Sequence, residues 1–370
     1  MKKILLISLI TSSVFSQTSN IFEPIDLFDL EYVSNTEISP SGDKVLYQRN
    51  YNDIMTDQSF SNIWLINYDG TNNRPITTGN YKDNSPKWSN QGDKFIFQSN
   101  RDSKSQIFLF DLKNNSIQKL TNFQYSIQSI KWSPDDNYIL FSSFIDSKRK
   151  SLIKMPEKPK GAKWNDPPVE ISDLNYRYDS SGYRKPGEVQ FFTIPVSGGT
   201  PRQISNIKPE KRAGQAEWLG NDKIIFSANL NDDSDYNTNN SEIYILSLES
   251  GKHEALTSRN GPDSSPKVSN DNSMIAYLGY DDEYLGYQQN SIYVMKPDGS
   301  SKFKIQLNLD RNISNIYWSA DDKRIYFQFD DKGITKIGST TLEGKFQTEV
   351  DQIGGLSFSR PYSGGFFSLS

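Results

Sequence analysis

The chain has 370 residues, with 41 Lys and Arg against 45 Asp and Glu, and a formal net charge of −4. It contains no Cys, which excludes disulfide bonds and thiolate chemistry. The mild acidity argues against a nucleic acid partner, because phosphate binding requires a basic face.

The first residues are typical of a targeting segment. Lys2 and Lys3 precede a mostly apolar stretch over residues 4–15, and compact residues suit cleavage before Gln17. We predict a signal peptide over residues 1–16, because the stretch is too short to span a membrane. Its removal takes away two positive charges and changes the net charge from −4 to −6. The mature chain, which has no other apolar run of membrane-spanning length, is predicted to be exported to the periplasm or the extracellular space.

One phrase recurs along the rest of the chain. Trp-Ser-Pro-Asp-Asp at residues 132–136 returns as Trp-Ser-Asn-Gln-Gly at 88–92 and as Trp-Ser-Ala-Asp-Asp at 318–322. Looser copies lie at 39–43, 218–222 and 268–272. Such spacing indicates one supersecondary unit that is used many times.

The copy at residue 88 shows the unit best. Trp88 is expected to open a first strand, followed by a turn with Gly92 and by strands over 94–99, 106–111 and 118–121. Four antiparallel strands in about 40–50 residues describe a propeller blade. Lead-in sequences at 83–87 and 263–267 place Pro86 and Pro266 where we expect strand starts, which need no ladder donor.

The predicted fold is therefore all-β. It is a β-propeller over residues 17–370, built of four-stranded antiparallel blades, six recognisable and a seventh incomplete. The blades are predicted near 36–78, 83–122, 129–206, 215–258, 263–308 and 314–350, with a partial blade at 354–370.

The third blade carries a long insertion near residues 146–188. It begins with basic residues and ends with Tyr-Arg-Tyr-Asp-Ser-Ser-Gly-Tyr at 176–183. Long excursions from a compact repeat are usually functional or disordered, and the aromatic and Arg content favours an ordered surface.

The last predicted blade is half-finished. Residues 354–359 resemble another first strand, and residues 364–370 resemble its second strand. A half-blade would expose an unpaired edge, so we expect the chain to be the N-terminal part of a longer protein.

The repeat resembles the TolB-like propeller repeat, which is shared with the N-terminal propellers of the prolyl oligopeptidase family of serine peptidases. The stretches 176–183 and 190–199 are similar to dipeptidyl- and acylaminoacyl-peptidases of that family. The resemblance covers nearly all of the mature chain. It implies a seven-bladed propeller that caps a following α/β-hydrolase domain and restricts access to short or unstructured peptides. The implied partner is a peptide substrate, reached through that hydrolase domain.

The catalytic chemistry of that family is not visible in these residues. It needs a Ser in a Gly-x-Ser-x-Gly nucleophile elbow, together with Asp and His. Residues 355–359 match this motif except at the last position, where Ser replaces Gly. His253 is the one His, and we interpret it as an exposed turn residue because no nucleophile surrounds it. We predict no catalytic residue, metal or cofactor here, and enzymatic activity of the chain itself stays uncertain.

The candidate sites are few. Arg177 and Tyr178 are the predicted peptide contacts, since an Arg near a chamber can pair with a peptide carboxylate. Residues 231–237 are rich in oxygen ligands but lack the Gly and closing Glu of a Ca²⁺ loop, which favours a solvated loop. Asp83 and Asp263 are interpreted as turn residues that bond to the backbone. The recurring Trp residues are interpreted as packing residues.

Two functions fit this sequence. The first is a non-catalytic propeller region of a secreted peptidase, which gates access of short peptides to a hydrolase domain not present in this chain. The alternative is a stand-alone TolB-like periplasmic propeller that binds proteins. A glycan-binding propeller is a weaker option, because no loop favours it.

Overall fold

The computed structural model describes residues 22–147, 156–165, 168–171, 173–179, 181–208, 211–353 and 365–370. The predicted signal peptide, the basic start of the insertion and residues 354–364 of the predicted seventh blade lie outside the described residues. No helix in the described part of the chain is long and apolar enough to cross a membrane.

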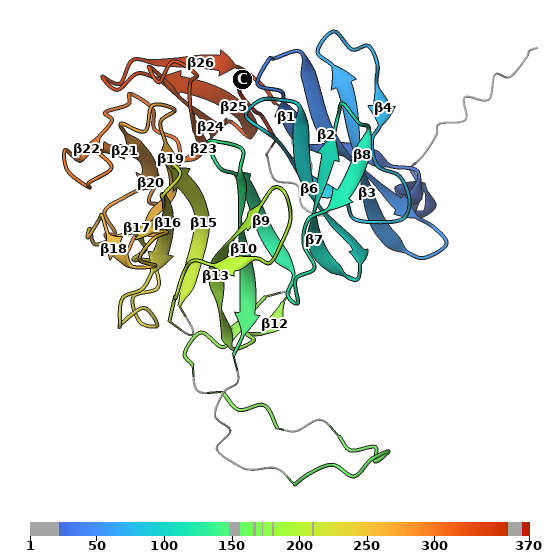
Figure 1. The fold of residues 1–370 in the computed structure, drawn as a ribbon. Coiled ribbons are helices and arrows are strands. Elements are labelled where there is room, and N and C mark those ends of the chain that lie inside the picture. The colour runs from blue at the N-terminus through green and yellow to red at the C-terminus, as the bar shows by residue number, and fades with distance from the viewer. Residues whose placement is uncertain are drawn as a thin grey trace, which may run out of the picture.

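Six four-stranded antiparallel sheets form the blades of a propeller, which confirms the predicted fold class (Figure 1). A single short 3₁₀ helix, η1 (Pro24–Phe28), precedes them in the described residues. The strands of blades 1 to 3 are β1 (Glu31–Ile38), β2 (Lys44–Asp53), β3 (Gln58–Asn67), β4 (Arg74–Pro75); β5 (Asn84–Trp88), β6 (Lys94–Asp102), β7 (Lys104–Asp111), β8 (Ser116–Lys119); and β9 (Ile127–Trp132), β10 (Tyr138–Asp146), β13 (Gly187–Pro195), β14 (Arg202–Gln203). Those of blades 4 to 6 are β15 (Arg212–Leu219), β16 (Lys223–Asn229), β17 (Glu242–Ser247), β18 (His253–Ala255); β19 (Asp263–Val268), β20 (Ile275–Gly279), β21 (Ser291–Met295), β22 (Phe303–Lys304); and β23 (Ile313–Trp318), β24 (Ile325–Asp331), β25 (Ile334–Thr340), β26 (Phe346–Val350).

The repeated Ser organises the turn between the first two strands of a blade. The hydroxyl of Ser133 donates to Asp135 at 2.6 Å and accepts from the amide of Tyr138 at 2.9 Å. Ser319 makes the same pair of bonds in blade 6. The fourth turn residue has a positive φ, which explains the Gly, Asp or Asn found there: Gly42, Gly92, Asp136, Asn272 and Asp322. The recurring phrase is therefore a self-contained hairpin turn.

The same turns also tie neighbouring blades together. The carboxylate of Asp136 in blade 3 accepts from the amide and side chain of Asn90 in blade 2, at 2.9 and 2.7 Å. It also accepts from the amide of Gln91 at 3.1 Å. Asp322 in blade 6 accepts in the same way from Asn270 in blade 5. The repeat thus encodes contacts between blades as well as the turn itself.

The position of the first strand corrects one prediction. Trp88 ends β5 instead of opening it, because the lead-in residues themselves form the strand. Pro86 and Pro266 lie within β5 and β19, in register shifts between Asn84 and Lys87 and between Ser264 and Lys267. Both were expected at strand starts. A bulge tolerates Pro because the ladder is interrupted there.

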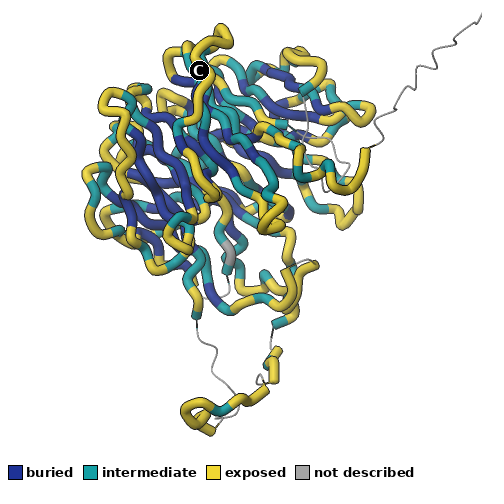
Figure 2. The backbone as a smooth tube through the Cα atoms, turned by 90° about the vertical axis from the view of Figure 1, so that its right-hand side faces the viewer, coloured by how far each residue is buried: buried dark blue, intermediate teal, exposed yellow. Residues whose placement is uncertain are grey.

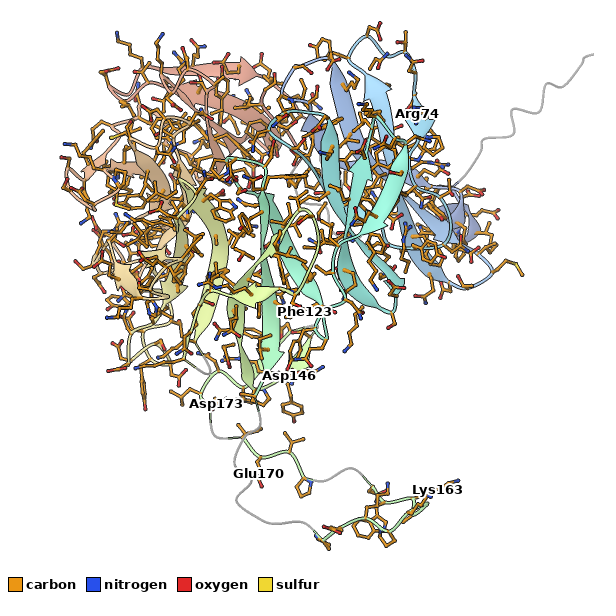
Figure 3. The ribbon with its side chains drawn as sticks, viewed as in Figure 1. Arg74, Phe123, Asp146, Lys163, Glu170 and Asp173 are labelled. Carbon is orange, nitrogen blue, oxygen red and sulfur yellow. The ribbon has the colours of Figure 1, made fainter. Side chains whose placement is uncertain are left out.

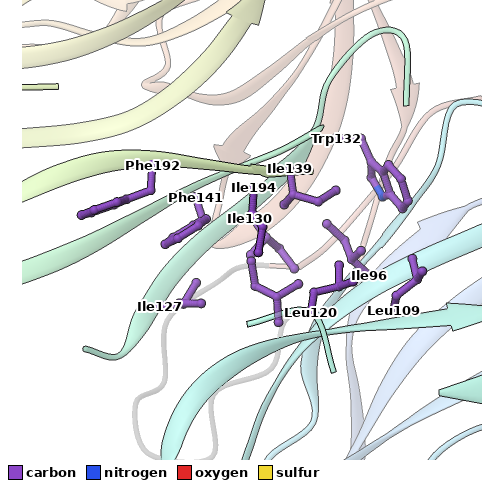
Figure 4. Packing of buried hydrophobic residues seen from close by; sticks show 11 residues of the cluster. Ile96, Leu109, Leu120, Ile127, Ile130, Trp132, Ile139, Phe141, Phe192 and Ile194 are labelled. Carbon is purple, nitrogen blue, oxygen red and sulfur yellow. The ribbon is translucent and has the colours of Figure 1, made fainter. Parts of the chain in front are cut away.

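The hydrophobic core lies between the blades. Successive residues of a strand face opposite sides of the sheet, so Ile139 and Phe141 of β10 pack toward blade 2, whereas Leu140 packs toward blade 4. Figure 4 shows the layer between blades 2 and 3, where Ile96 and Leu109 meet Ile130. Burial is highest along the middle of the blades and falls toward the loops (Figure 2).

The C-terminal residues 365–370 lie between blade 6 and blade 1. The amide of Ile38 in β1 donates to Ser368 at 2.9 Å, and the side-chain amide of Gln328 in β24 donates to the carbonyl of Gly365 at 2.9 Å. The rings of Phe367 and Tyr317 are 5.0 Å apart. These residues have no strand assignment, where a second strand was predicted.

Candidate functional site: a charged ring in the propeller channel

A cavity of about 550 Å³ lies between the first strands of the blades. Side chains from β1, β5, β9, β15, β19 and β23 line it, together with Phe366 and Phe367 near the C-terminus. Because every blade contributes its first strand, this cavity is the central channel of the propeller.

One equivalent position of the first strands carries a polar or charged side chain in every blade. It is the residue directly before the Trp of the repeat, or before the aliphatic residue that replaces the Trp. In blades 1 to 6 it is Glu37, Lys87, Lys131, Glu217, Lys267 and Tyr317. Five of these side chains line the channel, and the sixth, Glu217, contacts two of the lining lysines. We call these six residues the channel ring.

The Trp residues hold the ring strands in place. Each indole is 8% exposed, and the indole of Trp132 donates to the carbonyl of Lys87 at 2.9 Å. Trp88 and Trp318 donate in the same way to the carbonyls of Glu37 and Lys267, both at 3.0 Å. Each of these bonds joins a Trp to the ring residue of the preceding blade. They confirm that the recurring Trp residues are packing residues, with an added hydrogen-bonding role.

Glu217 is the centre of the ring's ion pairs. Its Oε1 accepts from Lys267 at 2.6 Å and also from Lys131, so three blades meet at one carboxylate oxygen. The three side chains are 17–23% exposed. The Lys267 ammonium also lies 5.1 Å from the centre of the Tyr317 ring, in cation–π geometry. Lys87 pairs separately with Glu37.

Burial and mutual interactions shift the pKa values of the ring residues. Burial, followed by repulsion from Lys131 and Lys267, lowers the pKa of Lys87 to about 8. Burial also lowers the pKa of Lys131 to about 8, although Glu217 opposes the shift. Burial alone would raise the pKa of Glu217, but the two lysines outweigh it and hold this pKa at about 2. Glu217 is therefore ionised at neutral pH, and Lys87 and Lys131 lose charge above pH 8, whereas the pKa of Lys267 is raised.

The ring carries one more positive than negative charge, because it has three lysines and two glutamates. Uncharged amides surround it, among them Gln98, Gln128 and Gln215. The channel is thus a polar, slightly cationic passage with donors in excess.

The predicted contact residues Arg177 and Tyr178 lie elsewhere. They form β11 (Arg177–Tyr178), which pairs with β12 (Gly182–Tyr183) in the insertion of blade 3, and both are exposed. Arg184 lies over the Tyr178 ring at 5.8 Å. The residues that line the channel do not include them, and their contact with a peptide stays a prediction. The part of the insertion around Lys163 projects away from the blades (Figure 3).

The prediction that the side chains of Asp83 and Asp263 bond to the backbone of a turn was wrong, because both form ion pairs. Asp83 is fully buried and forms an ion pair with Arg101 at 2.7 Å, and Asp263 pairs with Arg259. Burying a carboxylate is costly unless it is paired and hydrogen-bonded, and here an Arg supplies both. Asp83 directly precedes β5 and Asp263 begins β19, so these pairs lie at the starts of the first strands of blades 2 and 5.

His253 begins β18 and is half-buried instead of exposed. Its ring lies 5.8 Å from Tyr244 and 6.2 Å from Phe226, edge-on to both. Residues 231–237 lie between β16 and β17. Within the described ranges, no group of three or more His, Asp or Glu side chains could hold a metal ion.

No protein-family model matches the chain. The chain is 25% identical over 352 residues to dipeptidyl-peptidase 5 of Porphyromonas gingivalis, covering 90% of this chain and 50% of that protein. The acylaminoacyl peptidase of Pyrococcus horikoshii shares the fold with a TM-score of 0.66 at 19% identity, covering 88% of this chain and 47% of that one.

The resemblance to peptidase propellers is confirmed. The β-propeller domain of the Trilobed protease from Pyrococcus furiosus, described as having an open velcro topology, matches with a TM-score of 0.57 at 17% identity. It covers 87% of this chain and 85% of that domain. The chain spans about half the length of the full-length peptidases that it matches.

Proposed function

We propose that this chain is the access-controlling propeller of an exported peptidase of the prolyl oligopeptidase family. A peptidase-associated propeller is supported by the similarity to dipeptidyl-peptidase 5 over nearly the whole chain. The single observation that carries the finer proposal is the channel, since all six described blades contribute to one polar passage.

The geometry explains how such a propeller would select substrates. The channel is ringed by half-buried ion pairs that join blades 3, 4 and 5. An extended peptide can offer its backbone amides to the side-chain amides of the passage, whereas a folded domain is excluded by size. Selectivity would therefore follow chain conformation more than side-chain identity.

The first experiment reads the gene downstream of the codon for Ser370. We expect an open frame that encodes a Gly-x-Ser-x-Gly elbow. A stop codon directly after Ser370 would overturn the proposal and favour the stand-alone binding propeller.

The second experiment tests gating in the complete protein. The propeller lacks Cys, so a single Gln128→Cys in the channel can be modified selectively with a bulky maleimide once any Cys elsewhere in the complete protein is replaced by Ser. We expect strongly reduced cleavage of a hexapeptide, with Tyr68→Cys on the exposed β3–β4 turn as the matched control. Equal cleavage by both labelled variants would contradict access through the channel.

A further inference from the structure

The channel ring has an excess of cationic donors that its own carboxylates do not satisfy. Lys131 and Lys267 share a single oxygen of Glu217, and Lys87 contacts Glu37. Each ammonium carries three N–H donors, and these contacts with the ring carboxylates use one on each lysine. The cavity lining includes all three lysines, so donors that remain face the channel.

The ring is also electrostatically under strain. Three lysines converge on one passage at which two carboxylates supply the negative charge, and the ammonium groups of Lys131 and Lys267 repel that of Lys87. An additional anion at this place would relieve the repulsion and supply acceptors for the remaining donors. Lys87, at 41% exposure, is the most accessible of the three.

We propose that Lys87 and Lys131 of the channel ring bind the C-terminal carboxylate of a peptide that lies extended in the channel. The inference rests on the proposed function for the identity of the ligand as a peptide. The neutral surroundings support a peptide: Gln128 and Gln215 can donate to and accept from its backbone, and Phe366 and Phe367 offer apolar contact. A small free anion would contact the lysines but would leave these amides and aromatic rings without a partner.

The test uses the full chain and the probe acetyl-Ala-Ala-Ala with a free C-terminal carboxylate, measured by isothermal titration calorimetry. The same peptide with a C-terminal amide is the comparison. We expect the acid to bind at least tenfold more tightly than the amide. Equal binding of the acid and the amide, or binding of neither, would overturn the proposal.

Variants then locate the site. Lys87→Gln should reduce the preference for the acid to twofold or less, whereas Lys87→Arg, which keeps the charge, should retain most of it. Lys252→Gln, on an exposed turn between β17 and β18, is the matched control and should change nothing. A circular dichroism melt of Lys87→Gln checks the fold. An unchanged preference in a folded Lys87→Gln would exclude this site.

Two further conditions separate the alternatives. Acetate titrated alone should bind at least tenfold more weakly than the peptide acid, and equal binding would show a small-anion site instead. Raising the pH from 7 to 9 should weaken binding about tenfold for each lysine required, because Lys87 and Lys131 both titrate near pH 8. Across this range Glu217 keeps its charge, and although burial opposes it, Glu217 raises the pKa of Lys267. Glu37 and Tyr317 are the other titratable residues of the ring. Peptide binding by this chain does not depend on what the gene encodes after Ser370. Failure of the carboxylate site can therefore be distinguished from failure of the proposed function.

Discussion

The contribution to stability of the hydrogen bond between a repeat Trp and the preceding blade can be measured by one matched pair of substitutions. Trp132 and Trp218 are both 8% exposed and occupy equivalent positions. The indole of Trp132 donates to the carbonyl of Lys87 at 2.9 Å, whereas the buried indole nitrogen of Trp218 has no hydrogen-bond partner among the described residues. Trp→Phe at each site removes nearly the same volume and apolar area, so these contributions cancel in the comparison.

The expected difference follows from the two nitrogen environments. Trp132→Phe loses a hydrogen bond worth about 1 kcal/mol. Trp218→Phe removes a buried, unsatisfied donor, which relieves a desolvation penalty of about 1–3 kcal/mol. Trp132→Phe should therefore lower the free energy of unfolding by about 2 kcal/mol or more beyond the loss in Trp218→Phe.

Equilibrium urea unfolding, followed by far-UV circular dichroism at 25 °C, measures this difference as a shift of midpoint at unchanged slope. Trp88→Phe and Trp318→Phe serve as replicates, because their indoles make the same bond. Equal losses at all four positions would refute the reasoning, since shape alone would then account for the role of the Trp.

Three other perturbations test the same structure. Burial raises the pKa of Glu242 from 4.5 to about 7, so its stabilising contribution is present below pH 4.5 and is lost as the pH rises to 7. Gln106 and Gln190 occupy the equivalent positions in blades 2 and 3, so Glu242→Gln introduces a residue that the fold already accepts there. The variant should be more stable than the parent at pH 8 by on the order of 2 kcal/mol, and its thermal unfolding should depend less on pH. An equally steep pH dependence in both proteins would count against the raised pKa of Glu242. Glu217→Gln leaves two half-buried lysines without their shared carboxylate. It should cost about 2–3 kcal/mol in urea unfolding, less than the loss of a fully buried ion pair, while exposed Glu254→Gln stays within about 0.5 kcal/mol. Similar losses in the two variants would contradict the ring's ion pairs. Asp136→Asn keeps a residue that tolerates a positive φ, but it replaces one of the carboxylate oxygens that accept from blade 2, including the acceptor of the Gln91 amide. It should lower the free energy of unfolding by about 1 kcal/mol, as should Asp322→Asn, which loses the equivalent bond in blade 6. A loss at only one of the two positions would show that these contacts between blades are not equivalent.

Local chemistry made the blades predictable from sequence. Ser133, Asp135 and Asp136 act within one hairpin turn, and their recurrence at a regular spacing indicates a repeated unit without any knowledge of its neighbours. The same locality limits the prediction of exact strand bounds. The strand that contains Pro86 was misplaced because a bulge changes which residues can join the ladder.

The channel ring was missed, although a signal for it existed. Aligning the copies of the repeat on the Trp places Glu37, Lys87, Lys131, Glu217, Lys267 and Tyr317 in one column. A single charged residue before a Trp is normally interpreted as a solvated side chain, and only the column as a whole shows a recurring position in the blade that is charged in five of six copies.

The sequence by itself determined the unit, a four-stranded blade with a Ser-capped turn, since the turn depends on residues within one repeat. The tertiary structure alone decided which charges meet. Lys131, Glu217 and Lys267 belong to three blades, and they share one oxygen only because the blades close around a channel. Strand periodicity fixes the face on which a side chain lies, but its partner across the channel depends on how the blades are arranged around the axis.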